Sequence, residues 1–153
     1  MTTTPDRTTD VQAAPTVAGA TTLANPAYQA FWLLRIAFVV APVLFGLDKF
    51  FHVLVDWDRY LAPELADLLG VDTHTLMYAV GVIEIVAGVV VAVLPRLGGY
   101  LVAAWLAGII VNLLLMADFY DVALRDFGLL VAALALARLA AAFPARHRAE
   151  RSW

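Results

Sequence analysis

Four long apolar segments, separated by polar or turn-forming stretches, dominate the pattern of the chain. They cover approximately residues 31–54, 75–94, 100–117 and 122–143. A helix needs roughly 20 apolar residues to cross the hydrocarbon core of a membrane, and each segment is close to that length. The second and third segments are joined by the sequence PRLGG, which predicts a tight turn. We therefore expect an all-α fold, an integral membrane antiparallel four-helix bundle.

The stretches outside these spans divide the chain into three predicted parts. Residues 1–27 are rich in Thr and Ala and have no hydrophobic periodicity, which predicts a disordered tail. We expect a membrane domain over residues 28–145 and a short basic tail over 146–153. Between the first and second spans, Pro63 and the leucines around it predict a short amphipathic helix on the outer membrane surface.

The composition supports a membrane protein and excludes several other classes. The chain is 63% hydrophobic and 15% charged, against about 45–50% and 25% in ordinary soluble domains. A net charge of −3 without a basic cluster gives no sign of a nucleic-acid partner. The chain has no cysteine, which excludes disulfides, thiolate metal sites and thiol redox relays. The lipid bilayer is therefore the expected partner.

The arginines gather on one side of the predicted bundle. The two tails and the PRLGG turn carry Arg7, Arg96, Arg146, Arg148 and Arg151. The connection after the first span is instead rich in acidic residues. The positive-inside tendency therefore places both termini in the cytoplasm. The preference for arginine over lysine, with abundant Ala, Val and Leu, is typical of GC-rich bacterial genomes. We expect the bacterial cytoplasmic (inner) membrane as the location.

The spans carry their polar residues on faces that also carry small residues. Helical spacing puts Glu84 on one face with two glycines, and Asn112 follows a glycine by four residues. Charges within hydrocarbon are costly unless they are paired, so we expect these faces to form the bundle interior. The predicted packing glycines are Gly46, Gly81, Gly88 and Gly108. The predicted intramembrane polar cluster is Lys49, Glu84, Asp126, Asp48, Arg125, Asn112 and His52.

Lys49 is the only lysine of the chain and is the centre of this cluster. Its expected partner is Glu84 or Asp126, and Arg125 is the expected partner of Asp48. A buried lysine or carboxylate can change its protonation state near neutral pH, so the cluster is a candidate site for protons or for a quinone headgroup. The alternative is an ion-pair network that only fixes the helices.

Other chemistry is less well supported by the sequence. His52 follows Asp48 by four residues, which puts both on one helical face, and His74 lies near the same membrane boundary. We considered a metal site and a bis-histidine haem there, and we favour an interfacial histidine with ordinary hydrogen bonds and no metal. Hydrolase, protease, phosphate-binding and dinucleotide motifs are absent, so no catalytic residue is predicted. Aromatic residues form either a pocket or a packed core: Phe45, Phe50, Phe51, Tyr78, Trp105 and Tyr120.

Two stretches resemble the DoxX-like family of bacterial membrane proteins. They are LLRIAFVVAPVLFGLDKFFH in the first span and YAVGVIEIVAGVVVAVLPRLGGYL in the second span and its turn. RDFGLLVAALALARL is similar to the last helix of the family, and the resemblance covers about residues 31–143. It rests on Arg35, Gly46, Lys49, Glu84 and Gly88.

This resemblance implies a four-helix inner-membrane protein linked to quinone redox chemistry. The expected function is an accessory or quinone-linked subunit of a membrane redox complex, with a quinone as the candidate ligand and a membrane or peripheral oxidoreductase as the candidate partner. The alternative is a non-enzymatic scaffold or a small proton or solute transporter. Assembly into a homo-oligomer stays open at this point.

Overall fold

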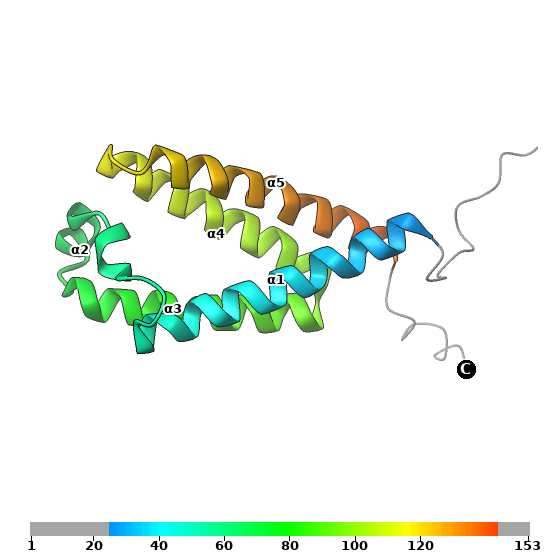
Figure 1. The fold of residues 1–153 in the computed structure, drawn as a ribbon, viewed down its shortest axis with the longest axis horizontal. Coiled ribbons are helices and arrows are strands. Elements are labelled where there is room, and N and C mark those ends of the chain that lie inside the picture. Colours follow the sequence, from blue (N-terminus) through cyan, green and yellow to red (C-terminus); the bar gives the residue numbers. More distant parts are fainter. Residues whose placement is uncertain (1–24, 144–153) are drawn as a thin grey trace, which may run out of the picture.

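The computed structural model describes residues 25–143, which are all-helical and contain no strand (Figure 1). Four long helices and two short ones follow one another: α1 (Pro26–Phe51), η2 (Trp57–Tyr60), α2 (Pro63–Leu69), α3 (Thr73–Val93), α4 (Pro95–Met116) and α5 (Tyr120–Ala142). The prediction of an all-helical fold is confirmed. Residues 1–24 and 144–153 lie outside the described residues; they include most of the predicted N-terminal tail, the last two residues of the predicted membrane domain and the predicted basic tail.

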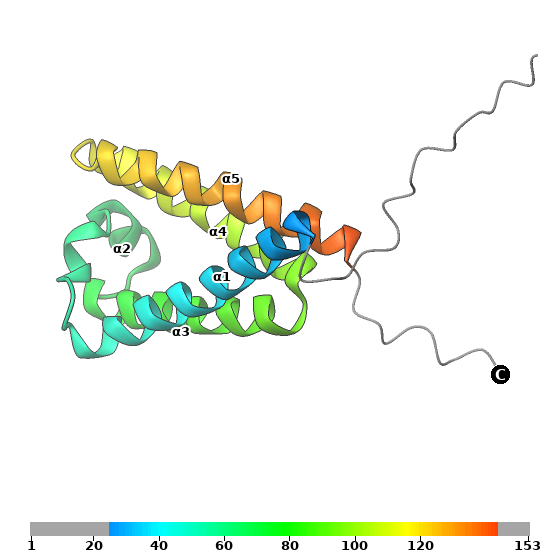
Figure 2. The ribbon, with the colours of Figure 1, turned by 45° about the vertical axis from the view of Figure 1, so that its right-hand side comes forward.

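The four long helices alternate in direction and form two pairs. Helix α1 packs along α3, and α4 packs along α5, with α3 and α4 in contact between the pairs. Figures 1 and 2 show the pairs converging where α3 meets α4 and diverging at the opposite end, where α2 lies between them. We call the end where the pairs converge the terminal end, because both Asn25 and Phe143 lie there. We call the end where they diverge the distal end. The rings of Tyr28 and Phe143 are 5.5 Å apart at the terminal end.

Three of the described helices, α1, α3 and α4, are long and apolar enough to cross a membrane, judged by length and composition. Their outward faces carry large apolar side chains; Leu33 on α1, for example, is 71% exposed. These helices indicate a membrane protein. Helix α5 is as long but carries four charged residues, Asp121, Arg125, Asp126 and Arg138.

Helix α1 begins earlier than the hydrophobic pattern predicted. Asn25 is its N-cap, and the side-chain Oδ1 accepts a hydrogen bond from the backbone N–H of Ala27 at 2.9 Å. Pro26 occupies the first turn, where a missing N–H costs nothing and the fixed φ suits a helix. The first two residues of α1 therefore belong to the stretch that the sequence assigned to the tail.

The PRLGG stretch is the first turn of α4 and not a separate turn. Leu94 alone separates α3 from α4, with φ −128° and ψ 70°. Pro95 then starts α4, as Pro26 starts α1. A Cβ at Gly98 would lie 2.5 Å from the Cα of Val91, so only glycine allows this close approach between consecutive helices. Gly98 therefore serves packing at a sharp corner, whereas Gly99 lies against Ala133 and Ala137 of α5.

Glycines also set the separation of α1 and α3. A Cβ at Gly46 would lie 2.6 Å from the Gly81 backbone oxygen, and one at Gly81 would lie 2.8 Å from the Gly46 oxygen. Gly88 lies against Val43 farther along the same contact. The predicted packing role is wrong for Gly108, which is exposed and has no atom within 4 Å of an added Cβ.

The apolar core lies toward the terminal end. It is formed by Phe31, Phe38, Ala87, Val91, Val102, Ala103, Leu106, Ala133, Leu136 and Ala140. Small residues on α4 and α5 let these helices approach closely, which is how membrane helices commonly pack. Since the pairs diverge away from this core, the polar residues of the spans gather in the distal half.

Candidate functional site

Lys49 and Glu84 form a buried ion pair between α1 and α3. The Lys49 Nζ lies 2.6 Å from the Glu84 Oε2, and the two side chains are only 4% and 12% exposed. Lys49 is in the last turn of α1, three residues after Gly46, and Glu84 follows Gly81 by three residues. The close approach of the helices at these glycines brings the two side chains within reach of one another.

Trp57 covers this ion pair from the distal side. The Lys49 Nζ lies 3.9 Å from the centroid of the Trp57 ring, within the range of a cation–π interaction. The indole Nε1–H of Trp57 donates to Asp48 Oδ2 at 2.7 Å. The indole thus fills the space above the lysine.

Asp48 stabilises the end of α1 and does not pair with a cation. Its Oδ1 accepts hydrogen bonds from the backbone N–H groups of Val53 and Leu54, both at 3.0 Å. Arg125 instead lies 3.4 Å from Asp121, one turn away on the surface of α5. The predicted Asp48–Arg125 pair is therefore wrong. The chain reverses directly after α1 and offers its own N–H groups to the aspartate before any other helix is reached.

Asp126 and Trp105 approach the ion pair from α5 and α4. Asp126 is half-buried and close enough to Glu84 for the two carboxylates to repel one another. The Trp105 indole N–H is buried and makes no hydrogen bond of normal geometry, although Glu84 is near enough to attract it. Lys49 thus bonds to Glu84 where the helix pairs diverge, and Asp126 repels Glu84 without a hydrogen bond or ion pair to either residue.

Asn112 anchors the connection that lies between the helix pairs. Its side-chain Oδ1 accepts from the buried backbone N–H of Ala62 at 2.9 Å, and its Nδ2 donates to the Tyr60 carbonyl at 2.6 Å. Ala62 and Ala66 are the buried residues here, whereas Leu68 is 80% exposed. The short helix predicted at Pro63 exists as α2, which packs on the bundle through Ala66 and leaves Leu68 and Leu69 exposed.

A cavity lies at the opposite end from this polar cluster. It has a volume of about 860 Å³ and lies between the start of α1, the α3–α4 corner and the end of α5. Its lining is Tyr28, Phe31, Trp32, Arg35, Val93, Leu94, Pro95, Arg96, Leu97, Tyr100, Ala140, Ala141 and Phe143. The aromatic residues that the sequence proposed for a pocket are a different set, and most lie toward the distal end.

Arg35 forms one wall of this terminal cavity. Its guanidinium lies 4.8 Å from the centroid of the Trp32 ring and also donates a hydrogen bond to the Ala92 carbonyl. Arg96 and Tyr100 add a second cationic group and a hydroxyl from the first turns of α4. The cavity thus combines aromatic walls with polar donors. The sequence signal that could have predicted this cavity is the clustering of Trp32, Arg35 and Arg96 near one membrane edge.

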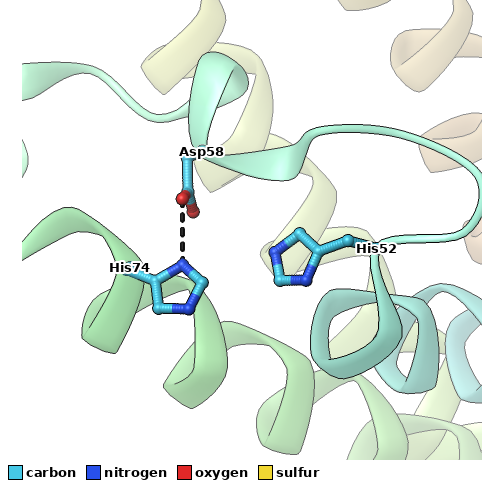
Figure 3. Close-up of side chains that lie close together, drawn as sticks. All are labelled: His52, Asp58 and His74. Atoms are coloured by element: carbon cyan, nitrogen blue, oxygen red, sulfur yellow. Dashed lines mark hydrogen bonds and ion pairs between the residues drawn. The ribbon is translucent and has the colours of Figure 1, made fainter.

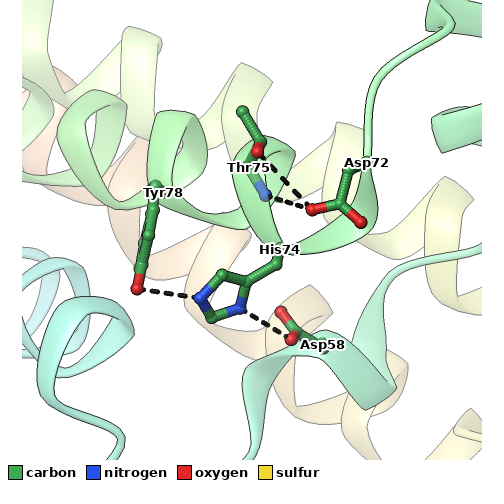
Figure 4. A network of polar contacts seen from close by, with 5 residues as sticks. All are labelled: Asp58, Asp72, His74, Thr75 and Tyr78. Atoms are coloured by element: carbon green, nitrogen blue, oxygen red, sulfur yellow. Dashed lines mark hydrogen bonds and ion pairs between the residues drawn. The ribbon is translucent and has the colours of Figure 1, made fainter.

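The histidines at the distal end form a separate group with Asp58 (Figure 3). His74 Nδ1 is 3.0 Å from Asp58 Oδ2, and His74 Nε2 is 2.8 Å from the Tyr78 hydroxyl (Figure 4). The His52 and His74 rings are stacked with centroids 5.3 Å apart. His52 follows the end of α1 with φ 52°, so it leaves the helical face that it was predicted to share with Asp48. Sequence reasoning missed Asp58.

Four residues of the predicted cluster thus have other surroundings: Asp48, Arg125, Asn112 and His52. Lys49 and Glu84 come together as an ion pair, and Asp126 is half-buried on α5 without a hydrogen bond or ion pair to either of them. Comparison of the chain with protein-family models, curated proteins and solved structures finds no match.

Proposed function

We propose that this chain is a four-span, DoxX-like protein of the bacterial cytoplasmic membrane. In this proposal it binds a quinone and acts as an accessory or quinone-linked subunit of a membrane redox complex. The length and composition of α1, α3 and α4 support three of the spans. The fourth span and the quinone each rest on a further observation.

The packing of α5 supports its role as the fourth span. Its 23 residues extend about 34 Å at 1.5 Å per residue, enough for roughly 30 Å of hydrocarbon. Ala133, Leu136 and Ala137 are fully buried in the bundle. Asp121 and Arg125 pair with one another near the distal end, and Arg138 is near the terminal end, where a long side chain reaches the membrane surface. Only Asp126 faces the interior from within the helix.

The terminal cavity is the observation that carries the quinone assignment. Its volume of about 860 Å³ falls within the usual range of small-molecule sites, roughly 300–1,000 Å³. A quinone ring is flat, apolar and bears carbonyl oxygens that accept hydrogen bonds. Trp32 and Tyr28 offer aromatic faces for the ring, and Arg96 and Tyr100 offer donors for its carbonyls. The cavity lies at the bundle end, so an isoprenoid tail can run into the surrounding lipid.

Quinone binding is tested on the purified full chain in lipid nanodiscs, with a short-chain ubiquinone as the probe. Quenching of tryptophan fluorescence gives the affinity, because Trp32 lines the cavity. We expect Tyr100→Leu and Arg96→Gln to weaken binding about tenfold, equivalent to about 1.4 kcal/mol. The matched controls Tyr120→Leu and Arg125→Gln alter the same residue types at the distal end and should leave the affinity unchanged. Absence of binding, or equal losses in the controls, would contradict the proposal.

A structural scaffold without a ligand is the second candidate, and the Lys49–Glu84 pair favours it. The two charges are bonded to one another, covered by Trp57 and largely removed from solvent. Such a pair fixes the register of two helices without any change of protonation. This candidate predicts that the chain binds no quinone and that disruption of the Lys49–Glu84 pair lowers only its stability.

A further inference from the structure

We propose that His52, Asp58 and His74 form a binding site for one divalent transition-metal ion of the Zn²⁺ type. The three residues come from three different elements: the residue after α1, the 3-10 helix η2 and the first turn of α3. One ligand atom from each lies within 4.8 Å of the other two. Figure 3 shows the three side chains facing one another. None of the three lines the terminal cavity.

The distances are close to those of a metal centre. Two ligand atoms on a tetrahedral Zn²⁺ ion lie about 3.3 Å apart, since each bond is about 2.0–2.2 Å. Asp58 Oδ2 and His74 Nδ1 are already 3.0 Å apart. His52 then needs only side-chain rotation to bring its nitrogen onto the same ion. Two imidazoles, one carboxylate and an open fourth position form a ligand set that zinc accepts.

The surroundings of His74 orient its ring for this role. Tyr78, one turn later on α3, has its hydroxyl 2.8 Å from His74 Nε2 (Figure 4). Such an interaction on the second ring nitrogen fixes the orientation of metal-bound histidines and tunes their affinity. It leaves Nδ1, which faces Asp58, as the coordinating atom.

An isolated Asp–His hydrogen bond accounts for less of the geometry. It explains neither the stacking of His52 on His74 nor the second carboxylate oxygen, Asp58 Oδ1, which is buried without a hydrogen-bond partner. A metal-bound water or a bidentate carboxylate would satisfy that oxygen. His52 also adopts a left-handed conformation, which usually selects glycine or asparagine after a helix. That conformation turns its ring toward His74.

The test uses the full chain, purified without a histidine tag, stripped with EDTA and titrated with ZnCl₂ by calorimetry in detergent. We expect one ion per chain and a rise in the melting temperature. His52→Gln, His74→Gln and Asp58→Asn should each abolish both effects. His147→Gln and Asp56→Asn are the matched controls and should bind like the parent chain. Tyr78→Phe should keep the stoichiometry and weaken the affinity about tenfold.

A second measurement covers variants that fail to fold. X-ray absorption of the zinc-loaded parent chain should show nitrogen and oxygen ligands with two imidazoles, and no sulfur, because the chain has no cysteine. Absence of stoichiometric zinc binding at micromolar concentrations would overturn the proposal. So would binding that the three ligand substitutions leave unchanged, or a bound ion with fewer than two imidazoles.

Discussion

The Lys49 ammonium group lies 2.6 Å from the Glu84 carboxylate at the point where Gly46 and Gly81 bring α1 and α3 together. The contact joins the only lysine of the chain to the only acidic residue of the second predicted span. Because both side chains are largely removed from solvent, each compensates the cost of burying the other. The glycine contact and the ion pair therefore depend on one another.

Replacing the lysine tests this dependence. Lys49→Met leaves the Glu84 carboxylate without its cation, and breaking a buried pair typically costs about 3–5 kcal/mol. Protonation of the carboxylate recovers part of that cost, so the observed loss should lie at or below this range. We expect a lower melting temperature in detergent, followed by circular dichroism or by a fluorescent dye.

Double substitutions identify the partner. Lys49→Met combined with Glu84→Gln should lose less stability than the sum of the losses of the two single variants, because only coupled residues have non-additive effects. Lys49→Met with Asp126→Asn should be close to additive, since the structure bonds Lys49 to Glu84. Stronger coupling to Asp126 than to Glu84 would show that the ion pair is assigned to the wrong carboxylate.

The substitutions Gly46→Ala and Gly108→Ala together test the packing of the helices, because one residue lies in a helix contact and the other does not. Gly46→Ala puts a Cβ 2.6 Å from a backbone oxygen of α3, which cannot move without separating the helices. Overpacking of this kind costs about 1–3 kcal/mol. Gly108→Ala meets no atom, and the better helix propensity of alanine makes it neutral or stabilising by up to about 1 kcal/mol. Equal thermal stabilities of the two variants would refute the α1–α3 contact.

Asn112 should control the order of the connection between α1 and α3. Asn112→Leu removes the acceptor of the buried Ala62 N–H and the donor to the Tyr60 carbonyl. An unsatisfied buried group costs about 1–3 kcal/mol. We expect faster hydrogen exchange over η2 and α2, measured by mass spectrometry, while exchange in the first turns of α4 stays slow. Unchanged exchange over η2 and α2 would mean that the amide does not hold this segment.

The helices were predictable because their apolar runs are long. The boundaries failed where proline was interpreted as a breaker. Pro26 and Pro95 both start helices, since the first turn needs no N–H from them. A hydrophobic pattern does not distinguish a glycine that allows a turn from a glycine that allows two helices to pack closely. For this reason PRLGG was assigned as a turn.

For the polar cluster, the sequence predicted only which helix faces carry charged residues. Helical spacing placed Lys49 and Glu84 inward but left Glu84 and Asp126 equivalent as partners. The relative rotation of α1, α3 and α5 decides between them, and it depends on packing between distant segments. Asp48 was misassigned because the chain reverses at His52, and local backbone groups then satisfy its carboxylate. Asp58 was missed because irregular segments have no periodicity.

The four-span proposal is tested most directly by the side of the membrane on which four single cysteines lie. The chain has no native cysteine, so Thr3→Cys, Asp67→Cys, Asp121→Cys and Ser152→Cys can each be labelled in intact cells with an impermeant thiol reagent. We predict labelling from outside at Asp67→Cys and Asp121→Cys, and labelling at Thr3→Cys and Ser152→Cys only after the cells are opened. A protein with three spans would instead expose exactly one of the two terminal cysteines to the outside reagent, and that result would contradict the account.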